Sequence, residues 1–297
     1  MLTRRQVAAS AAGVLFTTFA SKLRSARADG EWSAKVNRSL ALIEARSQGR
    51  LGVVVLDKAT GNLVAHRSDE RFPMCSTFKT LAAAAVLARV DRGEERLTRR
   101  VRFTGDVVVV NSPVTEHRAG GDGMTLSELC DAAITMSDNT AGNLLLAAIG
   151  GPEGLTRYVR TLGDPITRLD RLEPDLNEAQ PGDARDTTSP AAMVANLDKL
   201  LFSDALSSSS RDQLSAWLIG NKTGDTRLRA GLPRTWRVGD KTGSGERGTT
   251  NDAGIVWPPG RKPLILAIYL TGAASTAEGR NATLASVGRA VAETMEP

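Results

Sequence analysis

Histidine is scarce in this sequence, which contains only His66 and His117 among its 297 residues. A Ser-His-Asp triad needs a histidine beside the nucleophilic serine, and a zinc site needs one beside further ligands. His66 ends a predicted strand, His117 lies in a predicted loop, and neither has ligand-like spacing to other donor residues. We therefore expect no metal site and no cofactor, and we interpret both histidines as surface or structural residues.

Cysteine is equally rare, since Cys75 and Cys130 are the only two thiols. Spacing by itself does not show whether two cysteines meet in a disulfide. Our expectation is that both are buried free thiols.

An excess of charge is also missing from most of the chain, although its formal net charge is +5. Residues 1–28 contain five basic residues and no acid, which leaves 33 of the 38 basic residues against 33 acids. A nucleic-acid-binding domain usually carries a basic patch on its folded surface. The sequence therefore predicts no nucleic-acid partner.

Residues 1–28 have the features of an export signal. A twin-arginine pattern at Thr3–Val7 is followed by a small-to-apolar stretch from Val7 to Ala20, and Ala26-Arg27-Ala28 forms an A-x-A cleavage site. The apolar stretch is shorter than the ~20 residues that span a bilayer, which favours cleavage over a permanent anchor. We predict a twin-arginine-type signal peptide over 1–28 and an exported protein, periplasmic or secreted. We further expect a monomer that has no membrane contact after cleavage.

Hydrophobic periodicity predicts strands near both ends of the chain and helices between them. The predicted strands are Leu51–Leu56, Leu63–His66, Trp236–Thr242, Ala253–Trp257 and Leu264–Leu270. The predicted helices are Glu31–Gln48, Ser76–Val90, Leu126–Met136, Thr140–Ala148, Glu153–Thr161, Pro190–Phe202, Arg211–Ile219 and a closing helix from Thr276. This order indicates an α/β (α+β) fold, in which an antiparallel sheet built from both termini is flanked by helices and an all-helical lobe is inserted. We assign residues 29–70 plus 219–297 to the α/β lobe and 71–218 to the helical lobe.

Ser76-Thr77-Phe78-Lys79 is the only S-x-x-K motif of the chain. Residues three apart on a helix share a face, so the Lys79 amine is expected beside the Ser76 hydroxyl. Ser76 also falls at the predicted helix N-terminus, where free N–H groups and the helix dipole favour negative charge. A serine needs a neighbouring base to become a nucleophile. Taken alone, the motif favours a solvated helix face, where serine and lysine are common.

Two further short motifs are ambiguous when taken singly. Ser137-Asp138-Asn139 precedes a predicted helix and would serve equally well as its N-cap. The triplet Lys-Thr-Gly occurs twice, at 222–224 after a helix end and at 241–243 after a strand pattern. We favour the second copy for function, because a strand edge can present Lys241 and neighbouring hydroxyls to a ligand carboxylate.

Together, these motifs resemble a known family. One S-x-x-K, one S-D-N and one K-T-G in this order are typical of class A β-lactamases and penicillin-binding proteins. The long loop between Asp164 and Asp186 contains Arg171-Leu172-Glu173-Pro174-Asp175-Leu176-Asn177, which is similar to the omega loop of class A serine β-lactamases. The resemblance covers nearly everything after residue 28. It implies hydrolysis of the β-lactam amide of penicillins and cephalosporins, and hence antibiotic resistance.

The resemblance also assigns roles to matching positions. Ser76 would be the nucleophile, Lys79 would transfer protons, and Ser137 would protonate the departing ring nitrogen. Glu173, helped by Asn177, would activate the deacylating water. The residues implied in substrate binding are Asn139, which would bind the substrate's side-chain amide, and Lys241, Thr242, Gly243, Ser244 and Arg227, which would surround its carboxylate. Arg171 and Asp186 would clamp the omega loop (168–186), and its Glu173-Pro174 bond would be cis.

The sequence departs from the family pattern at a few positions. Asn111 stands where the family usually has an aromatic residue at the pocket mouth, which would weaken stacking against substrate. Cys75 precedes the nucleophile, where some carbapenem-hydrolysing relatives form a disulfide, but the partner position is Gly245. We therefore predict neither that bridge nor carbapenem hydrolysis.

Two other functions share the same motifs. A penicillin-binding DD-peptidase acylates in the same way but releases β-lactams slowly, and the Glu173–Asn177 pair argues against it. A β-lactam sensor acylates without turnover and needs a membrane signalling segment, which the sequence after residue 28 does not offer.

Overall fold

The computed structural model describes residues 32–295, in which strands from both ends of the chain form one five-stranded sheet. Its strands are β1 (Arg50–Asp57), β2 (Leu63–His66), β7 (Arg237–Gly245), β8 (Thr249–Trp257) and β9 (Leu264–Thr271). The order is β2-β1-β9-β8-β7, and each neighbouring pair is antiparallel. The predicted fold class is confirmed. The proposed signal peptide, 1–28, lies outside the described residues.

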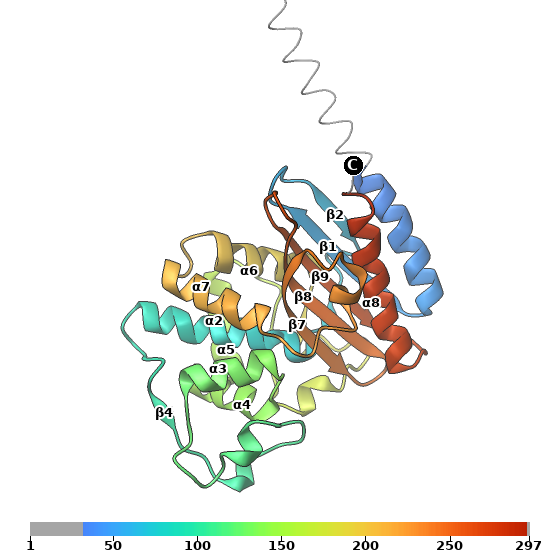
Figure 1. The fold of residues 1–297 in the computed structure, drawn as a ribbon. Coiled ribbons are helices and arrows are strands. Elements are labelled where there is room, and N and C mark those ends of the chain that lie inside the picture. Colours follow the sequence, from blue (N-terminus) through green and yellow to red (C-terminus); the bar gives the residue numbers. More distant parts are fainter. Residues whose placement is uncertain (1–31, 296–297) are drawn as a thin grey trace, which may run out of the picture.

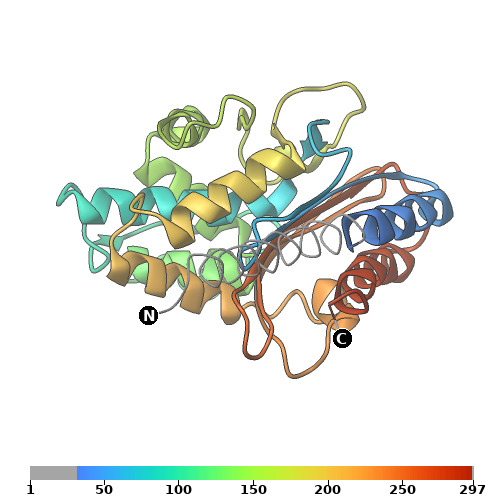
Figure 2. The same cartoon turned by 90° about the horizontal axis from the view of Figure 1, so that it is seen from above.

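The two faces of the sheet contribute to different hydrophobic cores. Successive side chains of a strand point to opposite faces, so Val54 of β1 enters one core while Val53 and Val55 enter the other. The second core is closed by the N-terminal helix over residues 32–47 and by α8 (Ala277–Ala292), which lie side by side on one face of the sheet (Figure 2). The first core continues into the helices on the opposite side (Figure 1).

Those helices lie between the two groups of strands in the sequence. They are α2 (Phe78–Asp91), α3 (Leu126–Thr135), α4 (Asn139–Ala148), α5 (Gly151–Thr161), α6 (Pro190–Phe202) and α7 (Ser208–Ile219). Short strands β3 (Phe72–Pro73) and β6 (Thr187–Thr188) pair with each other, as do β4 (Arg100–Val101) and β5 (Met124–Thr125). No helix within 32–295 is long and apolar enough to cross a membrane.

Helix α2 does not have the solvated face that is the alternative interpretation of the S-x-x-K motif. Every residue from Phe78 to Ala88 is buried. The helix contacts α3, α4, α5 and α7 and therefore has neighbours on nearly all sides. A helix buried on all sides is apolar all round, and its small alanines let the neighbouring helices approach closely.

Most predicted boundaries agree with the structure to within a few residues, and the larger differences have local causes. α7 begins three residues early, at Ser208, because the Ser207 hydroxyl accepts from the Ser210 N–H and caps the helix. β7 and β8 extend through polar residues that a hydrophobic pattern cannot detect. Their pairing continues to Gly245 opposite Thr249, which carries the second K-T-G along the strand.

Candidate active site

Ser76 lies in a turn of 3-10 helix (Cys75–Thr77) that leads directly into α2. Cys75 has a φ of +45°, a left-handed conformation that is uncommon for residues other than glycine. The turn is held by the Thr77 hydroxyl, which donates to the Met74 carbonyl at 2.8 Å. Backbone strain of this kind persists where surrounding contacts impose it, often at functional sites. The Ser76 side chain is thereby fixed at the start of a buried helix.

Lys79 lies one helical turn beyond Ser76, and its amine is fully buried. Its Nζ donates to Ser76 Oγ at 2.9 Å, so the expected proximity of the two groups is confirmed. The same nitrogen donates to the Ser137 carbonyl at 2.8 Å and to Asn139 Oδ1 at 2.7 Å. Glu173 Oε1 lies 3.0 Å away. The amine is therefore held by partners from three separate segments.

Glu173 reaches this cluster from a distant part of the chain. Ser76 Oγ donates to Glu173 Oε1 at 3.1 Å, and Asn177 Nδ2 donates to the other carboxylate oxygen. Asn143 on α4 fixes the Glu173 backbone, since its Oδ1 accepts the Glu173 N–H and its Nδ2 donates to the Glu173 carbonyl, both at 2.9 Å. The Glu173-Pro174 bond is cis, as expected. The carboxylate, 3% exposed, thus contacts the serine hydroxyl directly.

Both lysines of the site, Lys79 and Lys241, have a lowered pKa. Burial lowers the pKa of the Lys79 amine, although the adjacent Glu173 carboxylate acts in the opposite direction. Burial also holds the pKa of Lys241 well below that of an ordinary lysine, and the positive charges of Lys79 and Arg227 add to the effect. Burial is the largest cause of the lowered pKa for both amines.

The S-D-N segment serves both as a helix cap and as part of the site. Asp138, fully buried, accepts from the Ala141 N–H at 2.8 Å and caps α4. Its other oxygen accepts from the N–H groups of Val114 and Thr115, both at 2.9 Å. Ser137, with a φ of +57°, and Asn139 flank this anchor. The capping interpretation is therefore correct for the middle residue, while its two neighbours face the cluster.

Strand β7 brings the second K-T-G to the same place. Lys241 Nζ donates to Ser137 Oγ at 2.9 Å and to the Thr242 carbonyl at 2.8 Å. Gly243 allows the strand to approach the nucleophile turn, because a Cβ there would lie 2.9 Å from the Met74 carbonyl oxygen. The strand edge and the turn of Ser76 are thus in direct contact.

A cleft of about 520 Å³ opens between these segments. The predicted site residues that line it are Ser76, Ser137, Asn139, Asn177, Arg227, Thr242, Gly243 and Ser244. Lys79, Glu173 and Lys241 lie behind this surface and contact the lining hydroxyls. Asn111 borders the cleft with a φ of +60°.

Arg227 enters the cleft from the segment before the 3-10 turn Leu228–Gly231. Its guanidinium donates to Ser244 Oγ at 2.7 Å and to the carbonyls of Gly243 and Asn251, both at 2.8 Å. Nε donates to Asn281 Oδ1 at 3.0 Å. The cation is therefore fixed beside the β7 edge by neutral groups, and no carboxylate within residues 32–295 forms an ion pair with it.

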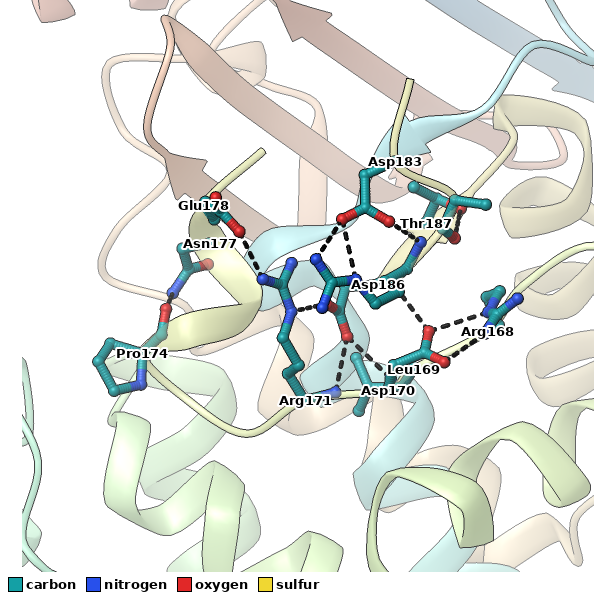
Figure 3. A network of polar contacts seen from close by, with 12 residues as sticks. Arg168, Leu169, Asp170, Arg171, Pro174, Asn177, Glu178, Asp183, Asp186 and Thr187 are labelled. Carbon is teal, nitrogen blue, oxygen red and sulfur yellow. Dashed lines mark hydrogen bonds and ion pairs between the residues drawn. The ribbon is translucent and has the colours of Figure 1, made fainter. Parts of the chain in front are cut away.

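The loop that carries Glu173 is closed by a buried ion pair (Figure 3). Arg171 Nε donates to Asp186 Oδ2 at 2.6 Å, while Asp186 Oδ1 accepts from the N–H groups of Asp170 and Arg171 at 2.8 and 2.9 Å. Arg171 also pairs with Glu178 at 2.7 Å. Both predicted clamp residues therefore lie where the two ends of the loop meet.

The two thiols are free and buried, as expected. Cys75 lies against β7, where a Cβ placed on Gly245 would be 2.7 Å from its Sγ. Burial raises the pKa of both thiols above that of an ordinary cysteine. Neither sulfur therefore has the thiolate character of a reactive cysteine.

Two residues of the site were missed in the sequence. Asn143 lies four residues after Asn139, so the shared helix face was a usable signal. Thr223 belongs to the first K-T-G, the copy that we had not favoured for function, yet it lines the cleft and its hydroxyl meets that of Thr242. Its relation to the site depends on the packing of α7 against β7, which sequence spacing does not reveal.

A hydroxyl held between a buried amine and a buried carboxylate, at the wall of a cleft, is an arrangement for nucleophilic catalysis with proton transfer. The fold and this constellation are those of a serine hydrolase.

Comparison with known proteins identifies the family. A family model described as "Beta-lactamase enzyme family" matches residues 34–295. A β-lactamase of Streptomyces fradiae is 46% identical over 98% of this chain and 96% of its own length. An ancestral class A β-lactamase of known structure has 62% sequence identity to this chain. The two structures superpose with a TM-score of 0.86, over 87% of this chain and 99% of that one. The class A β-lactamase of the last common ancestor of Gram-negative bacteria has 60% sequence identity and a TM-score of 0.86, over 88% of this chain and 99% of that one. The chain belongs to the class A β-lactamases, the serine enzymes that hydrolyse β-lactam antibiotics and confer resistance.

Proposed function

We propose that this chain hydrolyses penicillins and cephalosporins through an acyl-enzyme on Ser76. One observation carries the proposal: the Ser76 hydroxyl lies 2.9 Å from the Lys79 amine and 3.1 Å from the Glu173 carboxylate. Two basic groups within hydrogen-bond distance can take the proton as the oxygen attacks.

In the acylation step, Ser76 Oγ forms a bond to the lactam carbonyl carbon and the ring C–N bond breaks. The serine proton passes to the Lys79–Glu173 pair, and Ser137 delivers its hydroxyl proton to the ring nitrogen. The pair then returns the proton it took to Ser137, so one proton has moved from Ser76 to the ring nitrogen. The contact between Lys241 Nζ and Ser137 Oγ at 2.9 Å supports this delivery, because a cation stabilises the hydroxyl oxygen as it gives up its proton.

The edge of strand β7 contributes to oxyanion stabilisation and to substrate binding. The backbone N–H groups of Ser76 and Ser244 stabilise the oxyanion of the tetrahedral intermediate. Lys241, Thr242, Ser244 and Arg227 hold the substrate carboxylate, and the Arg227–Ser244 contact at 2.7 Å supports their joint action. Gly243 lets the strand approach, and Asn139 binds the side-chain amide of the substrate.

Deacylation depends on Glu173. Its carboxylate takes a proton from a water molecule that attacks the ester carbonyl, and the Ser76 oxygen leaves with a proton. Asn177 holds the carboxylate through its side-chain amide, while Arg171 and Asp186 keep the loop closed. The close approach of Glu173 to Ser76 favours this function over a slow DD-peptidase or a sensor that stays acylated.

The test uses mass spectrometry during turnover of a penicillin and a chromogenic cephalosporin. Ser76→Ala should abolish both hydrolysis and covalent labelling. Glu173→Ala should accumulate a stable penicilloyl-enzyme, because acylation continues and deacylation stops. Asp175→Asn, an exposed carboxylate on the same loop, is the matched control and should turn over normally. Hydrolysis by Ser76→Ala, or a Glu173→Ala protein that never acylates, would contradict the mechanism. Labelling without turnover in the unaltered protein would favour the sensor.

We also propose that residues 1–28 direct twin-arginine export to the periplasm or the medium, and that the mature enzyme is a monomer. The motif at Thr3–Val7 and the A-x-A site at 26–28 support export. The position of α2 to α7 between the two groups of sheet strands supports a division into an α/β lobe (29–70 plus 219–297) and a helical lobe (71–218). Mass spectrometry of the exported protein and its sedimentation would test the cleavage site and the oligomeric state.

A further inference from the structure

The first K-T-G copy, Lys222-Thr223-Gly224, lies directly beside the second. Its turn follows α7 and is fixed by the Lys222 N–H, which donates to the Thr135 carbonyl at 2.9 Å. Gly224 lets the turn pack onto β7, because a Cβ there would fall 2.0 Å from Asp240 Oδ2. As a result Thr223 lines the cleft, and its hydroxyl is hydrogen-bonded to that of Thr242.

The hydroxyl protons of this pair can be assigned from the neighbouring Asn221. Asn221 Oδ1 accepts the Thr223 backbone N–H at 3.0 Å, which identifies this atom as the oxygen. The Thr223 hydroxyl lies 2.8 Å from the same oxygen and must therefore donate to it. A hydroxyl has one proton, so in the contact between the threonines it is Thr242 that donates and Thr223 that accepts.

This orientation is the wrong one for binding an anion. A substrate carboxylate can only accept, so Thr242 must turn its proton from Thr223 to the carboxylate. Its oxygen then needs a new donor, and the Thr223 hydroxyl is the group already in contact with it. Asn221 is 2% exposed, so its Oδ1 needs a partner within the protein. This oxygen still accepts the hydrogen bond from the Thr223 backbone N–H after the Thr223 hydroxyl has turned away.

We propose that Thr223 is a positioning residue for carboxylate recognition: its hydroxyl donates to Asn221 in the free enzyme and reverses to donate to Thr242 when a β-lactam carboxylate binds. In the free enzyme the hydrogen bonds run from Thr242 to Thr223 and from Thr223 to Asn221. In the complex they run from Thr223 to Thr242 and from Thr242 to the carboxylate, so the Thr242 oxygen still has a donor. Chains of this kind strengthen each member, because a hydroxyl that accepts a hydrogen bond becomes a better donor. This inference rests on the proposed role of Thr242 in holding the carboxylate.

The experiment compares Thr223→Val, which keeps the shape and removes the hydroxyl, with Thr223→Ser, which keeps the hydroxyl. Steady-state kinetics are measured with a penicillin and with its methyl ester, which lacks the anionic charge. Thr223→Val should raise KM for the free acid about 3- to 10-fold, the effect of one hydrogen bond, with kcat within about twofold. It should leave the kinetics of the ester unchanged. Thr223→Ser should behave like the unaltered enzyme.

Thr242→Val separates this inference from the function on which it rests. If Thr242 holds the carboxylate, Thr242→Val raises KM for the acid and not for the ester, and adding Thr223→Val has no further effect. An unchanged KM in Thr242→Val would contradict the assigned role of Thr242 itself. A raised KM in Thr242→Val but not in Thr223→Val would overturn only the role of Thr223. Equal losses on acid and ester in Thr223→Val would show a merely structural contribution and would also overturn it.

Discussion

Arg171 donates from Nε to Oδ2 of Asp186 at 2.6 Å, and this ion pair joins the two ends of the loop that positions Glu173. Asp186 is 1% exposed and accepts two further backbone N–H groups, so its carboxylate satisfies three donors at once (Figure 3). The position of the Glu173 carboxylate beside Ser76 therefore depends on the Arg171–Asp186 ion pair, in which neither Glu173 nor Ser76 takes part.

Asp186→Asn is expected to destabilise the protein by about 3 kcal/mol, because it turns the contact of a buried carboxylate with a partly buried guanidinium into a contact between two donors. Urea unfolding measures the loss. Asp183→Asn is the matched control on the same loop, since Asp183 pairs with the half-exposed Arg185. Exposed pairs contribute little, so its loss should be clearly smaller. Equal losses in the two variants would show that Asp186 has no special part in closing the loop.

Asn143→Ala is expected to slow deacylation more than acylation. Asn143 holds both the N–H and the carbonyl of Glu173, and a shift of about 1 Å in a catalytic group can cost about 100-fold in rate. We expect kcat for a penicillin to fall about 10- to 100-fold, with acyl-enzyme accumulating in rapid-quench samples. A variant that keeps the normal kcat would show that the other contacts of the loop suffice to place Glu173.

The basic limb of the pH profile should depend on Lys241. The ammonium form binds the substrate carboxylate in our proposal, and it loses its proton as the pH rises through the lowered pKa of this amine. We therefore expect kcat/KM for a penicillin to fall at a pH below the ordinary lysine pKa. A guanidinium stays protonated, so Lys241→Arg should move this limb to higher pH. A limb at the same pH in both proteins would assign the titration to another group.

Both thiols should be unreactive in the folded enzyme. Cys75 and Cys130 are buried, and burial raises the pKa of each, so little thiolate is available. We expect a chromogenic disulfide reagent to label neither cysteine under native conditions and both after unfolding. Failure of either to react after unfolding without reductant would indicate a disulfide between them, contrary to the structure.

The local parts of the site were predictable because short-range geometry decides them. The placement of Lys79 beside Ser76 follows from helical spacing, and the alternation of Val53, Val54 and Val55 follows from strand geometry. Whether a segment forms a helix or one of the five long strands was predicted correctly for the same reason. The early start of α7 was missed because its Ser207 cap lies in a polar tract without hydrophobic periodicity.

Contacts between distant segments could be predicted only where a family motif indicated them, and other such contacts were not predicted. Glu173 was implied by family resemblance, whereas Asn143 and Thr223 were overlooked because their roles arise from partners that the chain brings together from elsewhere. The proton arrangement of Thr223 and Thr242 depends on the orientation of the Asn221 side chain, which a sequence does not encode locally.

The sequence by itself thus indicated the family through the resemblance of its motifs. Periodicity and spacing determined the order of helices and strands and the pairing of serine with lysine along one helix. Only the tertiary structure decided how the carboxylate 97 residues from Ser76 meets its hydroxyl and how the two K-T-G copies share a hydrogen bond. Burial likewise lowered the pKa of the two lysines, because the cost of removing an amine from water depends on everything packed around it.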